Sequence, residues 1–138
     1  MRTGLTPEDL GDMLDRPLLA TLATYRRDGL ALLSPVWFEW RDGGFNIAIG
    51  RDDVKARHLR RDPRASVVVA EVEPPMRGLE IRGSARLLPQ SPEVDRRIVG
   101  RYVAAAEVDD YLAGLPPGTL VRLEPGELRA WDFTDEHH

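Results

Sequence analysis

The sequence has no cysteine. This absence excludes thiol nucleophiles, disulfide bonds and thiolate metal sites, and it is typical of proteins from a reducing compartment. Histidine is almost as scarce. Apart from His58 there is only the terminal pair His137 and His138, which resembles the remnant of an expression tag. Neither an H-x-x-x-H pattern nor an EF-hand loop is present, so we expect no metal site.

Long apolar runs are also missing. No segment approaches the length needed to span a membrane, and the first ten residues lack the apolar core of a signal peptide, so we expect a cytoplasmic protein with no membrane partner. The net charge of −4 argues against a nucleic-acid-binding protein, which would carry a strongly basic surface. With 138 residues the chain has the usual length of one domain, and we expect residues 1–138 to form a single domain.

Basic side chains are concentrated in residues 50–64, GRDDVKARHLRRDPR, which contain the only lysine and six of the nineteen basic residues. The segment follows an apolar strand and crosses the start of a predicted helix, where unpaired N–H groups and the helix dipole favour an anion. Lys55 lies in the first turn if Asp52 or Asp53 is the N-cap, and it shares a helical face with Leu59. Two interpretations stay open: an anion site, or a solvated basic face with the two aspartates as cap and dipole partners.

Apolar patterns separated by turn residues predict strands. The expected strands are residues 18–26, 30–40, 45–50, 64–72, 77–89, 119–124 and 127–133. Turns at Arg27-Asp28-Gly29 and Asp42-Gly43-Gly44 would join the first three into an antiparallel meander, and a hairpin at Pro125-Gly126 would pair the last two. Residues 64–72 are almost wholly apolar, as in a strand buried on both faces.

Helices are predicted from cap residues and helical spacing. The expected helices cover about residues 7–14, 53–61 and 92–106, with a further piece through 112. Strands joined mostly by short turns, with helices inserted singly, favour an antiparallel α+β barrel over a parallel sheet. Three arginines, Arg77, Arg82 and Arg86, do not all share one strand face, and we expect them to be solvated.

Three segments in this order, LLATLATYRRDGLALLSPVWFEW, FNIAIG and VKARHLRRDPRASVVVAEV, resemble the split-barrel flavin-binding superfamily that includes pyridoxamine 5′-phosphate oxidase. The resemblance continues through IRGSARLLP and LEPGELRAWDF and covers nearly the whole chain beyond the first helix. In its most specific part, a strand, a basic helix, D-P-R and a buried strand follow one another, and Lys55 matches the phosphate-binding lysine of those oxidases. The resemblance implies an antiparallel split β-barrel with inserted helices that forms a homodimer.

Within the superfamily the chain most resembles small enzymes that use the deazaflavin coenzyme F-420, for which S-P-V-W-F on the second strand is a familiar variant. Pyridoxamine oxidases carry an arginine and a lysine on that strand, whereas residues 33–38 here read LSPVWF, and no segment matches the arginine-containing closing stretch of those oxidases. We therefore do not expect vitamin B6 chemistry. The resemblance implies instead an oxidoreductase that transfers hydride from reduced coenzyme F-420 to a small unsaturated or otherwise reducible substrate.

The same resemblance implies which residues hold the cofactor at the subunit interface. Backbone groups at the edge of its ring are expected from Val36, Trp37, Ala48 and Ile49. Contacts with its phosphate-bearing tail are expected from Gly50, Arg51, Lys55, Arg57 and Arg61. No catalytic side chain is expected, because the cofactor carries the chemistry while the protein supplies alignment and electrostatics.

Aromatic residues divide between this pocket and plain packing. Trp37 and Trp40 lie an odd number of residues apart on one expected strand and would face opposite sides. We favour Trp37 for the pocket, with plain packing as the alternative. The tyrosines Tyr25, Tyr102 and Tyr111 are assigned to surface or helix packing and not to the site.

Two other functions stay open. One is an FMN-binding oxidase or electron-transfer protein of the same fold, which the yellow absorbance of retained FMN would distinguish. The other is a non-catalytic protein that binds flavin, haem or another tetrapyrrole. Haem is the weakest of these ligands, because His58 is the one obvious axial ligand.

Overall fold

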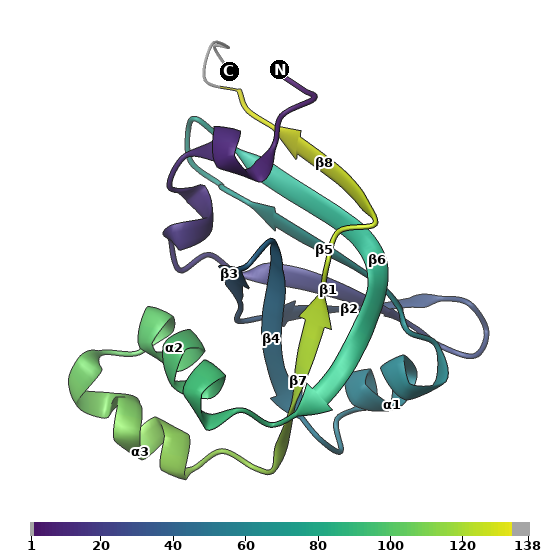
Figure 1. The fold of residues 1–138 in the computed structure, drawn as a ribbon, viewed down its shortest axis with the longest axis vertical. Helices are drawn as coiled ribbons and strands as arrows, with labels where there is room; N and C mark the ends of the chain where they lie inside the picture. The colour runs from purple at the N-terminus through teal and green to yellow at the C-terminus, as the bar shows by residue number, and fades with distance from the viewer. Residues whose placement is uncertain (1, 134–138) are drawn as a thin grey trace.

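The computed structural model describes residues 2–133. Its strands are β1 (Ala20–Tyr25), β2 (Ala31–Val36), β3 (Glu39–Arg41), β4 (Gly44–Gly50), β5 (Arg64–Ala70), β6 (Gly78–Pro89), β7 (Gly118–Leu123) and β8 (Glu127–Trp131). Its helices are α1 (Val54–Arg61), α2 (Pro92–Tyr102) and α3 (Val108–Ala113), with short 3-10 helices at Pro7–Leu10, Met13–Asp15 and Ala105–Glu107. The strands wrap around a common interior, with α1 on one side of the lower end and α2 and α3 on the other (Figure 1).

Strand β6 holds the two halves of the barrel together. The strand order is β2-β1-β5-β6-β7-β4-β3, all pairs are antiparallel, and β8 also pairs with β6. The first part of the strongly curved β6 pairs with β5 and β8, and its last part, Ala85–Pro89, pairs with β7 (Figure 1). Gly83 lies between the residues that pair with β8 and those that pair with β7, and an added Cβ there would lie 2.7 Å from the Glu124 carbonyl oxygen. The predicted antiparallel split-barrel α+β fold is confirmed.

Two helices begin where their cap residues predict. The Asp53 side chain caps α1 by accepting a hydrogen bond from the Lys55 backbone N–H at 2.9 Å. The Ser91 hydroxyl accepts one from the Val94 N–H at 3.2 Å, and Pro92 occupies the first position of α2. These two caps fix where the chain leaves β4 and β6.

The predicted three-stranded meander is wrong. Residues 30–40 form two strands, of which β2 pairs with β1 while β3 pairs with β4 in the other half of the barrel. Trp37 and Phe38 lie between them, and Phe38 is fully buried with its ring 5.3 Å from that of Phe45. The break cannot be recognised in the apolar sequence, because Phe38 is buried in the shared core at the point where the chain crosses from one half of the barrel to the other. Trp37 and Trp40 therefore do not share a strand.

The predicted closing hairpin is also wrong. Strands β7 and β8 both pair with β6 and follow one another along it. With 12 residues, β6 is long enough to pair with both strands, whereas local turn chemistry at Pro125-Gly126 suggested a hairpin.

Strand β5 is buried on one face, not on both. Ala65, Val67 and Val69 point into the core, whereas Ser66 and Val68 are partly exposed. The expected helix over 7–14 is two 3-10 turns, because the chain between them passes through Gly11 at a φ of 63°.

Arg77 is not solvated. Its guanidinium donates two hydrogen bonds of 2.7 Å to the Glu71 carboxylate, and the two side chains are 15% and 1% exposed. These bonds hold the pKa of Glu71 below its ordinary value of 4.5, against the opposing effect of burial. Sequence spacing placed Arg77 on a strand, but it lies just before β6, beside the carboxylate that follows β5.

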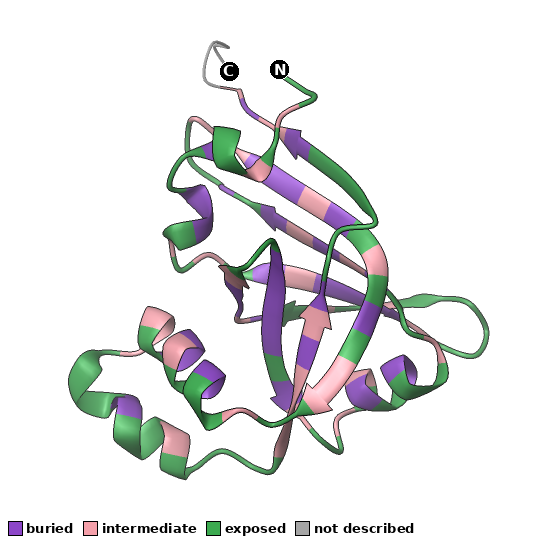
Figure 2. Ribbon diagram, viewed as in Figure 1, coloured by how far each residue is buried: buried purple, intermediate pink, exposed green. Residues whose placement is uncertain are grey.

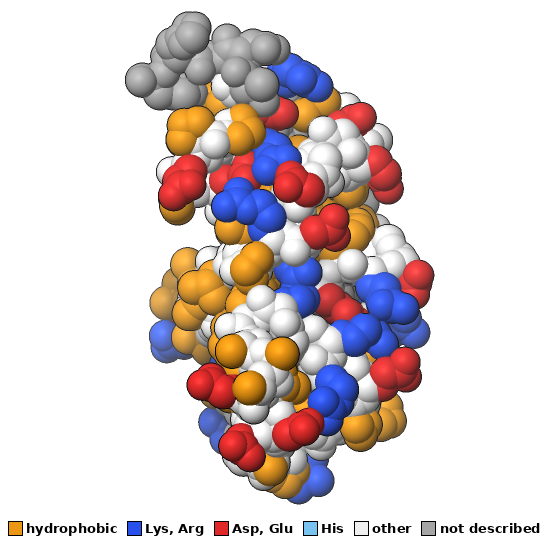
Figure 3. Space-filling model, turned by 90° about the vertical axis from the view of Figure 1, so that its left-hand side faces the viewer, with side chains coloured by type: hydrophobic (Ala, Val, Ile, Leu, Met, Phe, Trp, Pro, Cys, Tyr) orange, Lys and Arg blue, Asp and Glu red, His pale blue; other side chains and the backbone are white. Residues whose placement is uncertain are grey.

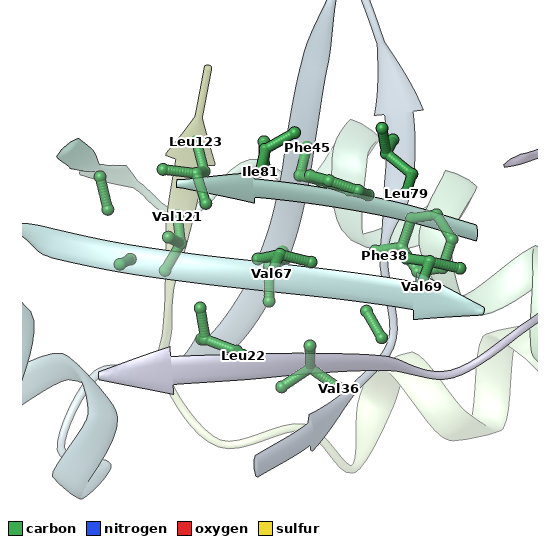
Figure 4. Packing of buried hydrophobic residues seen from close by; sticks show 14 of the residues in the cluster. Leu22, Val36, Phe38, Phe45, Val67, Val69, Leu79, Ile81, Val121 and Leu123 are labelled. Carbon is green, nitrogen blue, oxygen red and sulfur yellow. The ribbon is translucent and has the colours of Figure 1, made fainter. Parts of the chain in front are cut away.

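The core lies between the two halves of the barrel. Figure 4 shows inward-pointing side chains from both, including Leu22 and Val67 from one half and Phe45, Val121 and Leu123 from the other. Strand β4 is buried along most of its length, whereas α3 is largely exposed (Figure 2). The barrel is therefore closely packed, and α3 is attached to its outside.

Candidate functional site

A pocket of about 450 Å³ opens between the ends of β2 and β4, the start of α1, and the helices α2 and α3. Its volume falls within the roughly 300–1,000 Å³ typical of small-molecule sites. From the strands and their ends it is lined by Leu19, Pro35, Val36, Trp37, Ala48, Ile49 and Gly50. From the helices and their flanks it is lined by Asp53, Lys55, Asp95, Ile98, Val99, Tyr111 and Leu115. The walls are mostly apolar, with a few polar side chains.

Strand β4 leads into α1 at the edge of this pocket. The Asp53 backbone N–H donates to the Gly50 carbonyl at 3.1 Å, which turns the chain into the helix. The Lys55 amine lies 3.0 Å from the Asp53 carboxylate, and the lysine side chain is 17% exposed. Although burial opposes it, hydrogen bonds from the Lys55 N–H and amine hold the pKa of Asp53 below its ordinary value of 3.8. The amine in the pocket is thus already paired with a carboxylate.

The expected cofactor residues fall into two groups. The pocket brings together Val36, Trp37, Ala48, Ile49, Gly50 and Lys55. The other three, Arg51, Arg57 and Arg61, are exposed and lie outside its lining. The Arg61 guanidinium donates to the Tyr25 carbonyl instead. On the side of the molecule that carries α2 and α3, acidic and basic side chains are interspersed (Figure 3).

Trp37 forms the middle of an aromatic stack in the pocket wall. Its ring lies 4.7 Å from that of Tyr102 at an interplanar angle of 7°, and 5.3 Å from that of Tyr111 at 29°. The Tyr102 hydroxyl donates to the Leu18 carbonyl at 2.7 Å and accepts from the Phe38 N–H at 3.3 Å, which fixes that side of the stack. Tyr111 is 42% exposed and lines the pocket, where the sequence did not place it.

Helix α2 is fixed by an ion pair between the buried Glu39 carboxylate and the partly exposed Arg97. The Glu39 carboxylate accepts hydrogen bonds from the Arg97 guanidinium at 2.9 and 3.0 Å and from the Asn46 amide at 2.9 Å. Although burial opposes the charge, these bonds hold the pKa of Glu39 below its ordinary value of 4.5. One turn on, the Arg101 guanidinium donates to the Arg16 carbonyl at 2.8 Å. The wall that α2 contributes is therefore anchored to the barrel.

The pocket residues from α2, α3 and the following segment were missed from the sequence. They lie far along the chain from β2 and β4, so no local pattern connects them to those strands. One signal was present. Asp95 lies three and four residues before Ile98 and Val99, so a carboxylate shares an apolar helix face, and all three side chains are buried.

His58 does not line the pocket. It is 8% exposed, and its Nδ1 lies 2.9 Å from the hydroxyl oxygen of the fully buried Thr24, which packs α1 against β1. Among residues 2–133 no group of three or more acidic or histidine side chains could hold a metal ion. His137 and His138 lie outside the described residues. In the described range no helix is both long enough and apolar enough to cross a membrane.

Several solved structures share this fold. A conserved hypothetical protein from Mycobacterium tuberculosis is 25% identical, with a TM-score of 0.75 over 97% of this chain and 90% of its own. An F-420 reductase is 24% identical, with a TM-score of 0.64 over 89% of this chain and 98% of its own. HutZ, a haem storage protein from Vibrio cholerae, is 22% identical, with a TM-score of 0.73 over 95% and 98%. The last two similarities establish the fold alone.

Among curated proteins none matches the sequence. The family profile described as pyridoxamine 5′-phosphate oxidase matches residues 6–132. That span includes the strands and helices of the described structure and all the residues that line the pocket. The chain therefore belongs to the pyridoxamine 5′-phosphate oxidase family.

Proposed function

We propose that this chain is an oxidoreductase that transfers hydride from reduced coenzyme F-420 to a small unsaturated or otherwise reducible organic substrate. Its family, which contains flavin-binding oxidoreductases, supports the class of reaction. One observation carries the proposal: most of the residues expected to hold the cofactor, from segments that are separate in the sequence, line a single pocket. The F-420 reductase of the same fold supports the choice of cofactor.

The pocket suits a flat ring held by its edge. Strand β3 pairs with β4 only at Gly44, Phe45 and Asn46, so beyond Asn46 the second edge of β4 has no strand partner within residues 2–133. The backbone groups of Ala48 and Ile49 that face this second edge, and not β7, are available to polar atoms on a ring, whereas the Gly50 carbonyl already accepts from the Asp53 N–H. Apolar side chains from α2 would cover a ring face. The bound cofactor would supply the hydride, and the protein would align it and exclude water.

The charged groups favour a long anionic tail over a compact phosphate. Lys55 is the basic residue of the pocket, but Asp53 already neutralises it, so a phosphate there would have to compete with a carboxylate. The exposed Arg51 and Arg57 lie beyond the pocket, where a polyglutamyl tail could pass over them. Strand β2 carries no basic residue, so we do not propose oxidation of pyridoxamine phosphate.

We also propose a homodimer with the cofactor at the subunit interface. Strand β2 is one of the two edges of the strand order, and exposed leucines lie on it and beside it. Leu19, Leu30 and Leu33 are 59%, 60% and 65% exposed. An edge strand flanked by exposed apolar side chains is a surface that another chain can cover.

Titration of the purified protein with coenzyme F-420 and with FMN, followed by fluorescence quenching, tests the cofactor. We expect F-420 to bind more tightly, and its affinity to fall between low salt and ~0.5 M salt, where the Debye length drops below about 5 Å. Tighter binding of FMN, or an F-420 affinity that salt does not change, would favour the FMN-binding alternative.

Lys55→Ala tests the anion contact directly. A charge-assisted hydrogen bond contributes about 1.5–3 kcal/mol, and because Lys55 is shared with Asp53 we expect the lower end of this range, roughly tenfold weaker cofactor binding, with little change in melting temperature. Arg64→Ala is the matched control, because Arg64 lies in the same basic segment but is paired with Asp62 outside the pocket. If both variants bind both cofactors as tightly as the parent, Lys55 does not contact the ligand.

A further inference from the structure

One carboxylate in the pocket has no role in the arrangement described so far. Asp95, on the first turn of α2, is 8% exposed and lies beside the apolar side chains of Ile98 and Val99 in the pocket wall. Its Oδ2 accepts a hydrogen bond from the Gln90 side chain at 3.0 Å. Its Oδ1 takes no hydrogen bond from residues 2–133. Within residues 2–133 the buried side-chain polar atom without a partner is Arg101 Nε, so Asp95 Oδ1 is reached by solvent. A ligand that displaces this water from beside the apolar wall must supply a hydrogen-bond donor in its place.

Gln90 fixes how this carboxylate is presented. The backbone N–H of Gly118 donates to the Gln90 Oε1 at 3.0 Å. Because a backbone N–H can only donate, the Gln90 oxygen must face Gly118 and its NH₂ group must face Asp95. One oxygen of Asp95 is thus bound from within the protein, and the other keeps its capacity to accept a hydrogen bond from a ligand.

We propose that Asp95 accepts a hydrogen bond from the ring N–H at position 3 of the bound cofactor and so determines which way round the ring lies. The proposal rests on the proposed function, because it requires a flavin-type ring in this pocket. The pyrimidine edge of flavins and of deazaflavins has one N–H donor between two carbonyl acceptors. Asp95 matches the N–H and repels the carbonyls, so a ring turned the other way would face an unpaired carboxylate.

Riboflavin and 3-methylriboflavin are the probes. They share the ring and lack a phosphate, so their binding does not depend on Lys55, and they differ only in whether position 3 carries a hydrogen or a methyl group. We expect the parent protein to bind riboflavin at least about tenfold more tightly, as measured by quenching of flavin fluorescence, because a hydrogen bond to a charged group is lost on methylation. Equal binding of the two probes, or no binding of either, would overturn the proposal without any variant.

Asp95→Asn keeps the shape of the side chain and changes what it presents. The Gln90 NH₂ group would hold the new amide oxygen, so the new NH₂ group would face the pocket as a donor. We expect this variant to bind riboflavin at least about tenfold more weakly than the parent does, and to bind the two probes within about twofold of each other. Glu93→Gln is the matched control, since it removes the same charge from the same turn at a side chain that is 86% exposed and outside the pocket.

Melting temperatures of the free proteins show whether Asp95→Asn remains folded, so that weaker binding is not caused by unfolding. The preference between the two probes then separates a ligand contact from a structural role. If Asp95 serves only to hold Gln90, Asp95→Asn would leave the preference for riboflavin unchanged, and that result would overturn the proposal. Failure of the proposed function gives a different pattern. In that case coenzyme F-420 neither binds nor is oxidised. The ratio of the affinities for riboflavin and 3-methylriboflavin still measures the contact with Asp95, because neither probe is coenzyme F-420.

Discussion

Replacing Arg97 with methionine tests how firmly α2 is anchored to the barrel. The change removes two hydrogen bonds from Glu39, whose side chain is 8% exposed, and leaves the Asn46 amide as its only side-chain donor within residues 2–133. Breaking a buried ion pair from one side typically costs about 3–5 kcal/mol. Since the Arg97 side chain is 29% exposed and water reaches it, we expect a loss of about 2–3 kcal/mol in the free energy of unfolding at pH 7.

Urea unfolding followed by circular dichroism measures this loss, and Arg96→Met is the control. Arg96 is the preceding residue of α2, and its ion pair with Asp109 joins side chains that are 60% and 83% exposed. An exposed pair of this kind contributes about 0–1 kcal/mol. If Arg97→Met lowers the free energy of unfolding no more than Arg96→Met does, the buried pair does not anchor the helix.

The same variant has a defined pH dependence. The pKa of Glu39 in the folded protein lies below its ordinary value of 4.5, so the ion pair stabilises the fold above that pH and its contribution is lost as the pH falls through the folded value. The deficit of Arg97→Met should therefore be largest near neutral pH and shrink in acid, where a protonated Glu39 no longer needs a cation. A deficit that stays constant down to pH 3 would contradict this assignment.

Two further predictions concern packing and assembly. Gly78→Ala should lower the free energy of unfolding by about 1–3 kcal/mol, because its Cβ would lie 2.1 Å from the Trp131 ring, whereas Gly100→Ala, with nothing within 4 Å, should raise it by about 0.5–1 kcal/mol. Similar thermal shifts for both would refute the contact. Sedimentation at micromolar concentration should give twice the chain mass for the parent and a lower mass for Leu33→Glu, which places a charge on exposed β2; a monomeric parent would remove the shared-site proposal.

Features set by neighbouring residues were predictable from the sequence. The start of α1 follows from Asp53 and its end from Pro63, and the start of α2 follows from Ser91 and Pro92, because a cap acts within one turn. The first hairpin follows in the same way from the turn at Arg27-Asp28-Gly29. These local signals were enough to place the end of β4 and the start of α1 at the edge of the pocket, whereas the end of β2 at Val36 was missed.

Features set by long-range pairing were not predictable. The sequence around Trp37 and Phe38 is as apolar as an uninterrupted strand, because a crossing buried in the interior and a strand buried in a sheet contain the same residue types. The last two strands look like a hairpin, because nothing near Pro125-Gly126 reveals that β6 has room for both. The place of Asp95 in the pocket was not predictable for the same reason. Its spacing from Ile98 and Val99 shows a carboxylate on an apolar helix face, but it does not show which strands lie opposite that face.

Strand β6, shared by both halves of the barrel, leaves the protein with two separate levels of stability. Because β5, β7 and β8 all pair with β6, unfolding of either half breaks the pairs that it makes with this shared strand, and we expect opening of the barrel to require a free energy close to that of complete unfolding. Helix α3 has no such partner strand and is largely exposed (Figure 2). It can open at a small fraction of that free energy, so a ligand could enter past Tyr111 while the ends of β2 and β4 stay in register.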